Sequence, residues 1–171
     1  MPRRPAKKPR SPRRFLVQEH QASHHHYDFR LEMGGVLKSW AIPKGPSMKA
    51  GQWRLAIEVP DHSLSYFGYE GIIPKGSYGA GPVIVWDEGT YRPLGGEDPL
   101  DQLAAGHLQF QLSGKKLKGA FTIHRMKGRE REWLLIKKRD DYAESDWETV
   151  SELTASRLRR LKVKAPPCEA H

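Results

Sequence analysis

Three side chains of the kinds that bind metals lie close together near the start of the chain: His20, His26 and Asp28. Because successive side chains of a strand point to opposite faces, His26 and Asp28 share one face, and His20 lies on the preceding strand or on the approach to it. Two imidazoles and a carboxylate suit a divalent transition metal, with manganese, iron or zinc favoured over Cu(I). Three protein ligands leave coordination positions open, as catalytic sites require. The alternative is a solvated polar strand face, and His24 and His25 compete as ligands.

A guanidinium lies one strand step beyond the carboxylate, at Arg30. Beside a metal it can bind a phosphate through two parallel hydrogen bonds. Lys44 and Arg54 can add positive charge, with ordinary surface ion pairs as their alternative. His62 and Tyr66, four residues apart at the head of a loop, suit an acid/base or phosphate-binding pair, with a purely structural loop histidine as the alternative. These residues together predict a phosphate site beside a metal.

The segments that must position these residues alternate polar and apolar side chains. Opposite His26 and Asp28, the same stretch carries Tyr27, Phe29 and Leu31, which we expect to pack into a core. Gly34-Gly35 predicts a hairpin turn into a returning strand. Residues 61–81 predict little regular structure. The expected strands cover residues 15–20, 24–33, 36–42, 53–59, two strands within 82–94 joined by a turn at 87–89, two within 107–126, and 131–139; the expected helices cover 98–106 and 145–163.

About eight short strands with one or two short helices predict a mainly β fold. Their spacing favours a compact closed or nearly closed antiparallel β-barrel, with a sandwich as the alternative. We divide the chain into a disordered basic arm (1–14), a barrel domain (15–145) and a helical, basic C-terminal extension (146–171).

The net charge of +9 is concentrated at the two ends of the chain. Residues 1–14 contain seven basic side chains and no acid, and residues 157–171 contain five basic side chains and one acid. Basic ends around a nearly neutral centre indicate a polyanionic partner, most often nucleic acid, and predict salt-sensitive binding. A solubility tail or a cloning remnant is the alternative.

Composition excludes several other classes of protein. Cys168 is the single cysteine, so no internal disulfide can form. No apolar run approaches the roughly 18 residues of a membrane span, and the basic N-terminus lacks the apolar region of a secretory signal. We therefore expect a cytoplasmic protein, associated with the nucleoid if it binds DNA.

Four stretches together resemble the 3'-phosphoesterase domain of bacterial and archaeal DNA ligase D, in its stand-alone version. The resemblance spans about residues 15–143, and its motifs are specific. The stretches are VQEHQASHHHYDFRLEMGGVLKSWAIPKGPS, RLAIEVPDHSLSYFGYEGIIPKGSYGAGPVIVWDEGTY, LSGKKLKGAFTIHRM and EWLLIKKRDDYA.

The resemblance implies a compact barrel with a manganese-dependent activity that removes 3'-phosphates and 3'-terminal ribonucleotides. The product is a 3'-OH for the polymerase or ligase of non-homologous end joining. Zn²⁺, Co²⁺ or another divalent transition metal are alternatives to Mn²⁺. The expected partners are DNA 3' ends and the end-joining enzymes, with no membrane and a monomeric state.

Carried over by motif, the resemblance implies His20, His26 and Asp28 as metal ligands and Gln18 as a substrate-binding residue. The implied phosphate-binding and catalytic residues are Arg30, Lys44, Arg54, His62 and Tyr66.

Two departures from the family pattern keep a second function open. Pro60 stands where the family commonly has an acidic residue, and the region before the first strand is a bare basic arm. Either change favours a catalytically weak DNA-binding barrel recruited to an end-joining complex. A third hypothesis is a non-heme iron oxygenase, in which His26 and Asp28 would join His107 or His124.

Overall fold

The structure, a computed structural model, describes residues 13–167. The predicted basic arm up to residue 12, and Cys168, lie outside these residues. The first strand begins at Arg13, two residues before the predicted start of the barrel domain. The strands are β1 (Arg13–Gln21), β2 (His25–Met33), β3 (Val36–Ile42), β4 (Trp53–His62), β5 (Gly71–Ile73), β6 (Gly81–Pro93), β7 (His107–Gly114), β8 (Lys118–Arg125) and β9 (Glu132–Lys137).

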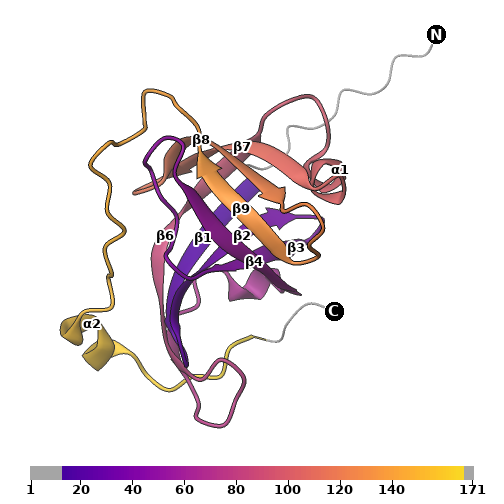
Figure 1. The fold of residues 1–171 in the computed structure, drawn as a ribbon. Coiled ribbons are helices and arrows are strands. Elements are labelled where there is room, and N and C mark those ends of the chain that lie inside the picture. The colour runs from indigo at the N-terminus through magenta and orange to yellow at the C-terminus, as the bar shows by residue number, and fades with distance from the viewer. Residues whose placement is uncertain (1–12, 168–171) are drawn as a thin grey trace, which may run out of the picture.

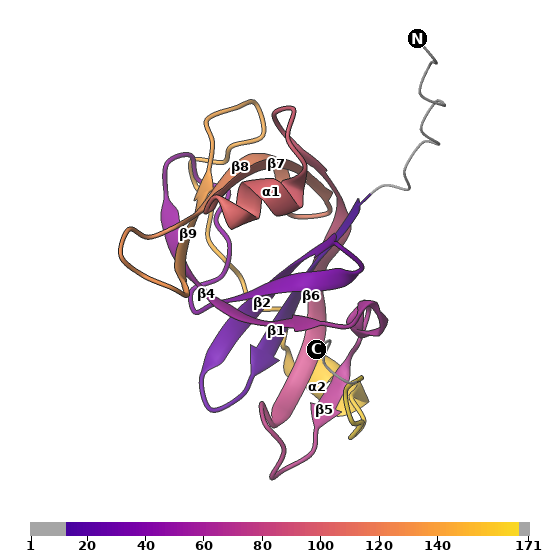
Figure 2. The ribbon, with the colours of Figure 1, turned by 90° about the vertical axis from the view of Figure 1, so that its right-hand side faces the viewer.

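Eight antiparallel strands close into a barrel (Figure 1), and β5 adds one further strand at the side of β6 (Figure 2). Their order is β1-β2-β3-β4-β9-β8-β7-β6, and β6 pairs back onto β1 to complete the circle. The helices are short: α1 (Pro99–Ala104), α2 (Ala155–Arg160) and the 3-10 helix η1 (Leu64–Tyr66). The prediction of a closed antiparallel barrel with few helices is confirmed.

The β2–β3 hairpin sets the register on which the site depends. Gly34 and Gly35 have φ angles of 62° and 78°, as the tightest hairpin turns require at both central positions. The turn fixes Arg30 opposite Ser39.

The barrel interior is filled by one parity of each strand. Tyr27, Phe29 and Leu31 are buried, as the alternation in β2 predicts. The ring of Phe29 lies 6.5 Å from that of Phe15 and 6.0 Å from that of Phe110, so β1, β2 and β7 share one core. Side chains of the other parity therefore point away from this core.

The predicted turn at residues 87–89 is wrong, because β6 runs without interruption through it. Asp87 is buried, and its carboxylate accepts hydrogen bonds from the backbone N–H groups of Lys115, Lys116 and Leu117. The residue types that suggest a turn thus stabilise the β7–β8 connection instead. Gly89 allows the close approach of β7, since a Cβ there would lie 2.1 Å from the carbonyl oxygen of Ser113.

The predicted helix over 145–163 is also mostly wrong, because only Ala155–Arg160 is helical. Residues 144–167, here called the C-terminal strap, run along the outside of the barrel from β9 to β5 (Figures 1 and 2). Glu19 is fully buried and accepts hydrogen bonds from the Ser151 hydroxyl and the Glu152 N–H, and the Val150 carbonyl accepts one from the Trp86 indole. These tertiary contacts use backbone groups that a helix would have paired internally.

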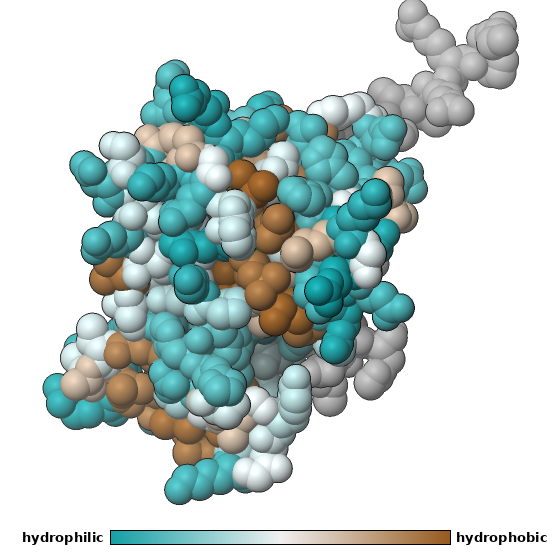
Figure 3. All heavy atoms as spheres, in the orientation of Figure 1, coloured by the Kyte–Doolittle hydropathy of each residue, from teal (hydrophilic) through white to brown (hydrophobic). Residues whose placement is uncertain are grey.

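The two ends of the barrel differ. The predicted helix over 98–106 is confirmed as α1, which Asp98 caps, and Leu103 packs onto the core at that end. The opposite end carries β5 and α2 (Figure 2). Half-buried apolar side chains of β4 and β9 reach the surface in the middle of one face (Figure 3). Within residues 13–167 no helix is long and apolar enough to cross a membrane.

Candidate metal centre and phosphate site

The polar side chains of β1 and β2 gather on the outer surface of the barrel, opposite the core. Gln18 pairs with Asp28 and His20 pairs with His26, so their side chains are neighbours on one face. Residues 63–80, which include η1 and β5, cover this face: the Gln18 amide donates to the Tyr69 carbonyl, and His20 contacts the Gly79 carbonyl. The cover explains how a barrel exterior can bury Gln18 completely and leave Asp28 only 6% exposed.

The structure brings the three predicted metal ligands together. His20 Nδ1 lies 3.3 Å from one carboxylate oxygen of Asp28, and His26 Nε2 lies 3.1 Å from the other. The candidate ligand atoms of the three residues all lie within 4.8 Å of one another. Within residues 13–167 this is the only group of three or more His, Cys, Asp or Glu side chains with such a geometry.

The outer nitrogens of both imidazoles bind backbone carbonyls. His20 Nε2 donates to the Gly79 carbonyl at 2.6 Å, and His26 Nδ1 donates to the His24 carbonyl at 3.0 Å. This arrangement turns the inner nitrogen of each ring towards Asp28. Histidines that bind metals are held in the same way, with the second ring nitrogen donating to a carbonyl or carboxylate. The residues present therefore fit a divalent cation.

The electrostatics of the centre favour an ionised carboxylate. Burial raises the pKa of Asp28, but hydrogen bonds from His20 and His26 and the positive charge of Arg30 outweigh it and hold that pKa well below its usual range. Burial lowers the pKa of His26, but the hydrogen bond and charge of Asp28 leave it above its ordinary value. Asp28 is thus a full negative charge placed between two imidazoles.

Arg30 is held on three sides beside this centre. Its Nε donates to Gln18 at 2.8 Å, one terminal nitrogen donates to Ser39 at 2.8 Å, and the other lies 3.6 Å from Asp28. The guanidinium also lies over the Tyr66 ring, 4.9 Å from its centroid. Side chains so fixed lose little conformational freedom when they bind an anion. The predicted substrate-binding residue Gln18 therefore contacts Arg30 and lies behind it.

A bulge in β4 brings His62 to the same face. Ser39 pairs with Val59 and Leu37 pairs with His62, so β4 has one residue more than β3 between these pairs. In a regular strand, residues 59 and 62 would face opposite sides. The extra residue of this β-bulge shifts the alternation by one position, so both Val59 and His62 line the site. His62 Nδ1 donates to the Pro60 carbonyl at 2.9 Å, and its ring packs edge-on against Tyr66 at 4.7 Å.

These residues line one cavity of about 380 Å³. Its lining includes the three candidate metal ligands, Arg30, His62 and Tyr66. Neither Lys44 nor Arg54 is part of its lining. Lys44 is exposed just beyond β3, while Arg54 pairs with the core residue Leu135 and so lies on the inner face of the barrel, where burial lowers its pKa.

Sequence reasoning missed Ser39 and Gly79. The hairpin turn at Gly34-Gly35 already fixes Ser39 opposite Arg30, so that contact had a signal in the sequence. Gly79 had none, because its contact with His20 depends on the path of residues 74–80. Its φ of 74° suits glycine, and a Cβ there would lie 3.2 Å from the His20 ring.

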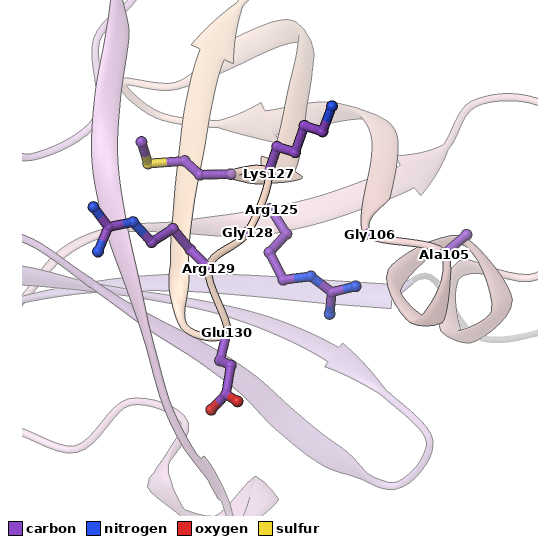
Figure 4. Close-up of a pocket in the computed structure, with 8 residues that line it drawn as sticks. Ala105, Gly106, Arg125, Lys127, Gly128, Arg129 and Glu130 are labelled. Atoms are coloured by element: carbon purple, nitrogen blue, oxygen red, sulfur yellow. The ribbon is translucent and has the colours of Figure 1, made fainter.

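A second hollow of about 510 Å³ lies between the end of α1 and the β8–β9 loop (Figure 4). Its cations, Arg125, Lys127 and Arg129, point in different directions and do not converge on one point (Figure 4). His107 and His124 pair with each other across β7 and β8, and neither joins the metal cluster. The iron triad through either of them is therefore not formed.

Comparison with known proteins agrees with the resemblance. The family model "DNA Ligase D 3'-phosphoesterase domain" matches residues 18–125, which contain every predicted site residue. The chain is 49% identical over 145 residues to the "Multifunctional non-homologous end joining protein LigD" of Pseudomonas aeruginosa, covering 84% of this chain and 17% of that protein.

Mycobacterial relatives give the same result. The "Multifunctional non-homologous end joining DNA repair protein LigD" of Mycobacterium tuberculosis is 45% identical over 114 residues, covering 67% of this chain and 15% of the relative. The "Multifunctional non-homologous end joining protein LigD" of Mycolicibacterium smegmatis is 38% identical over 133 residues, with 74% and 17% covered. The chain thus spans less than a fifth of the length of these relatives. It belongs to the DNA ligase D 3'-phosphoesterase domain family.

Proposed function

We propose that the protein is a metal-dependent phosphoesterase that heals DNA 3' ends. It would remove 3'-phosphates and 3'-terminal ribonucleotides and leave a 3'-OH for the polymerase or ligase of end joining. The observation that carries this proposal is the convergence of His20, His26 and Asp28 with Arg30 and His62 in one cavity. Family membership supports the choice of DNA ends as the substrate.

His20, His26 and Asp28 would hold the metal, which we take to be Mn²⁺, with Zn²⁺ or Co²⁺ as alternatives. A divalent cation supplies charge neutralisation and activation of the attacking water in such reactions. The ionised Asp28 and the two oriented imidazoles are the groups that this role requires.

Arg30 would bind the phosphate oxygens and stabilise the charge that develops on them. Preorganised donors act most strongly at a water-excluded site, and Arg30 is only 3% exposed. Gln18 and Ser39 would be positioning residues, because they fix the guanidinium without lining the cavity. These hydrogen bonds explain why the uncharged side chains of Gln18 and Ser39 are buried beside the Arg30 guanidinium.

His62 would stabilise charge on the phosphate or protonate the leaving oxygen. Its Nδ1 donates to the Pro60 carbonyl, and we assign this role to Nε2. Tyr66 orients the His62 ring from the side and lies under Arg30. Lys44 would contact a DNA backbone that extends beyond the cavity, whereas the position of Arg54 gives its predicted role no support.

The test is phosphate release from a primer–template with a 3'-phosphate, measured with and without Mn(II). We expect release by the parent protein, and a loss of about 100-fold or more in His26→Ala and His62→Ala. His124→Ala, at a half-buried histidine outside the cavity, is the matched control and should keep full activity.

Full activity in His26→Ala and His62→Ala would contradict the proposal. DNA binding by the parent protein without any phosphate release would instead support the catalytically weak DNA-binding barrel. Pro60 is the observation behind that second candidate, because its side chain offers no carboxylate at a position where the resemblance implies an acidic residue.

A further inference from the structure

The cavity beside the three candidate metal ligands is lined by side chains of two chemical kinds. Charged and polar side chains suit a phosphate. The apolar and aromatic lining includes Ala22, Ile73, Tyr78, Pro166 and Pro167. A phosphate gains nothing from apolar neighbours, so this lining implies that the ligand carries an apolar or aromatic part next to its phosphate.

We propose that Tyr78 stacks against the base of the 3'-terminal nucleotide. This inference rests on the proposed function, because it takes a DNA 3' end as the ligand. Tyr78 is 91% exposed, whereas Tyr27, Tyr66 and Tyr69 are buried. An aromatic ring left in water at the rim of a phosphate site is suited to stacking on a base, since every base offers a π face.

The backbone around Tyr78 is fixed relative to the metal cluster. The next residue, Gly79, accepts the hydrogen bond from His20 Nε2, and the turn is closed by bonds from the Ser77 N–H to Pro74 and from the Ala80 N–H to Ser77. The base and the 3'-phosphate of one nucleotide are joined through a single ribose. A ring attached one residue from the contact with the metal ligand is therefore placed to meet that base.

The C-terminal strap contributes Pro166 and Pro167 to the apolar lining. The Ile72 N–H donates to the Lys162 carbonyl, the Lys164 N–H donates to the Ile72 carbonyl, and the Tyr69 hydroxyl donates to the Lys164 carbonyl at 2.6 Å. These bonds hold Pro166 and Pro167 at the cavity. Two rigid rings without charge form a wall against which a ribose or base can pack.

Stacking tolerates every base, as an enzyme that heals arbitrary DNA ends requires. By alanine substitution, the stacking of one base on an aromatic side chain corresponds to a change of roughly 5- to 150-fold in affinity. Tyr78 would therefore govern how tightly the terminal nucleotide binds without selecting its identity.

The test uses an oligonucleotide with 2-aminopurine as its terminal base and a non-hydrolysable 3'-phosphonate, bound to the protein with Mn(II). We expect quenched fluorescence with the parent protein and with Tyr78→Phe. Tyr78→Ala should lose the quenching and weaken binding by roughly 5- to 150-fold. Tyr142→Ala, a half-exposed tyrosine away from the cavity, is the matched control and should behave as the parent does.

A second oligonucleotide with an abasic terminal nucleotide separates stacking from general damage. Tyr78→Ala should bind it as well as the parent protein does, because the partner of the ring is already missing. Equal quenching in the parent protein and in Tyr78→Ala would overturn the inference. So would a Tyr78→Ala variant that binds both oligonucleotides more weakly than the parent by the same factor. If Tyr78 quenches the fluorescence but a true 3'-phosphate is not released, the proposed function alone is rejected. If phosphate is released but no quenching depends on Tyr78, the stacking alone is rejected.

Discussion

At the scale of single residues, the arrangement around Arg30 makes a prediction about Gln18. Gln18→Leu removes the acceptor for Arg30 Nε, and a buried donor without a partner costs about 1–3 kcal/mol. The guanidinium should shift, and we expect phosphate release to slow by roughly 10- to 100-fold, as 1.4 kcal/mol corresponds to a factor of 10. Steady-state kinetics and Mn(II) titration by calorimetry measure the two effects separately.

The affinity of Gln18→Leu for Mn(II) should stay close to that of the parent, because the Gln18 side chain bonds the Tyr69 carbonyl and Arg30 Nε and is not a candidate metal ligand. Asp28→Asn is the opposite case, because it changes a candidate metal ligand. Its affinity for Mn(II) should fall by at least about 10-fold, since the loss of a residue that only hydrogen-bonds to a metal ligand already lowers metal affinity by that factor. A Gln18→Leu variant with lost metal binding and an Asp28→Asn variant with intact binding would contradict these assignments.

A second residue-scale prediction concerns stability and pH at Asp140. Burial raises its pKa, but the Ala120 N–H, the Lys137 ammonium and the Tyr142 N–H outweigh this and lower the pKa below its usual value. The side chain of Lys137 is fully buried and lies 2.7 Å from Asp140. A carboxylate with a lowered pKa in the folded state stabilises the fold above its unfolded pKa, near 3.9, and loses this effect as the pH falls through the folded pKa.

Asp140→Asn should therefore lower the free energy of unfolding by about 1–2 kcal/mol at pH 7. The difference from the parent should shrink as the pH falls from about 4 through the lowered pKa of the folded state, because protonation removes the stabilising charge. Urea unfolding at several pH values checks this. A difference that stays constant down to pH 2 would show that the charge of Asp140 contributes nothing.

At the scale of elements, the sequence predicts the strand that carries Asp28 and Arg30 better than it predicts the segments around it. Alternation in residues 24–33 correctly places Asp28 and Arg30 opposite Phe29, because the period of a strand is a local property of the chain. The continuous β6 and the C-terminal strap were mispredicted, because Asp87 and Glu19 bind backbone groups about 30 and 130 residues away. Such long-range bonds override local propensity and leave no local pattern.

The contact between Glu19 and the strap gives the element-scale prediction. Glu19 is fully buried and accepts from His25, Ser151 and the Glu152 N–H, so Glu19→Ala leaves several donors without partners. We expect a loss of about 2–4 kcal/mol of stability and early protease cleavage within residues 144–167. Glu144→Ala, an exposed acid whose backbone makes the strap's own bond to Met48, is the control and should resist cleavage.

At the scale of the whole molecule, the C-terminal strap has two properties that bear on DNA binding. It carries the cations Arg160, Lys162 and Lys164, and it reaches the cavity through Pro166 and Pro167. A DNA strand whose 3' end lies in the cavity would therefore pass close to this basic surface. Its phosphates would contribute affinity that does not depend on sequence.

Replacing Arg160, Lys162 and Lys164 together by Ala should weaken binding of a 3'-phosphate oligonucleotide and flatten its salt dependence. Each lost phosphate contact reduces the log–log slope by about 0.7–0.9, so the slope should fall by roughly 2–3. Fluorescence anisotropy between 50 and 200 mM salt, about the range over which such contacts dominate, measures this slope.

The matched control replaces three cations at the other end of the barrel, Arg125, Lys127 and Arg129 (Figure 4). Both triple variants lower the net charge by the same amount, so a general electrostatic attraction would change both slopes equally. A local track along the strap would change the slope only in the first variant. The strap cations belong to the segment that reaches the cavity, whereas the control cations line the hollow between α1 and the β8–β9 loop, so the comparison distinguishes a directed DNA path from a uniformly basic protein.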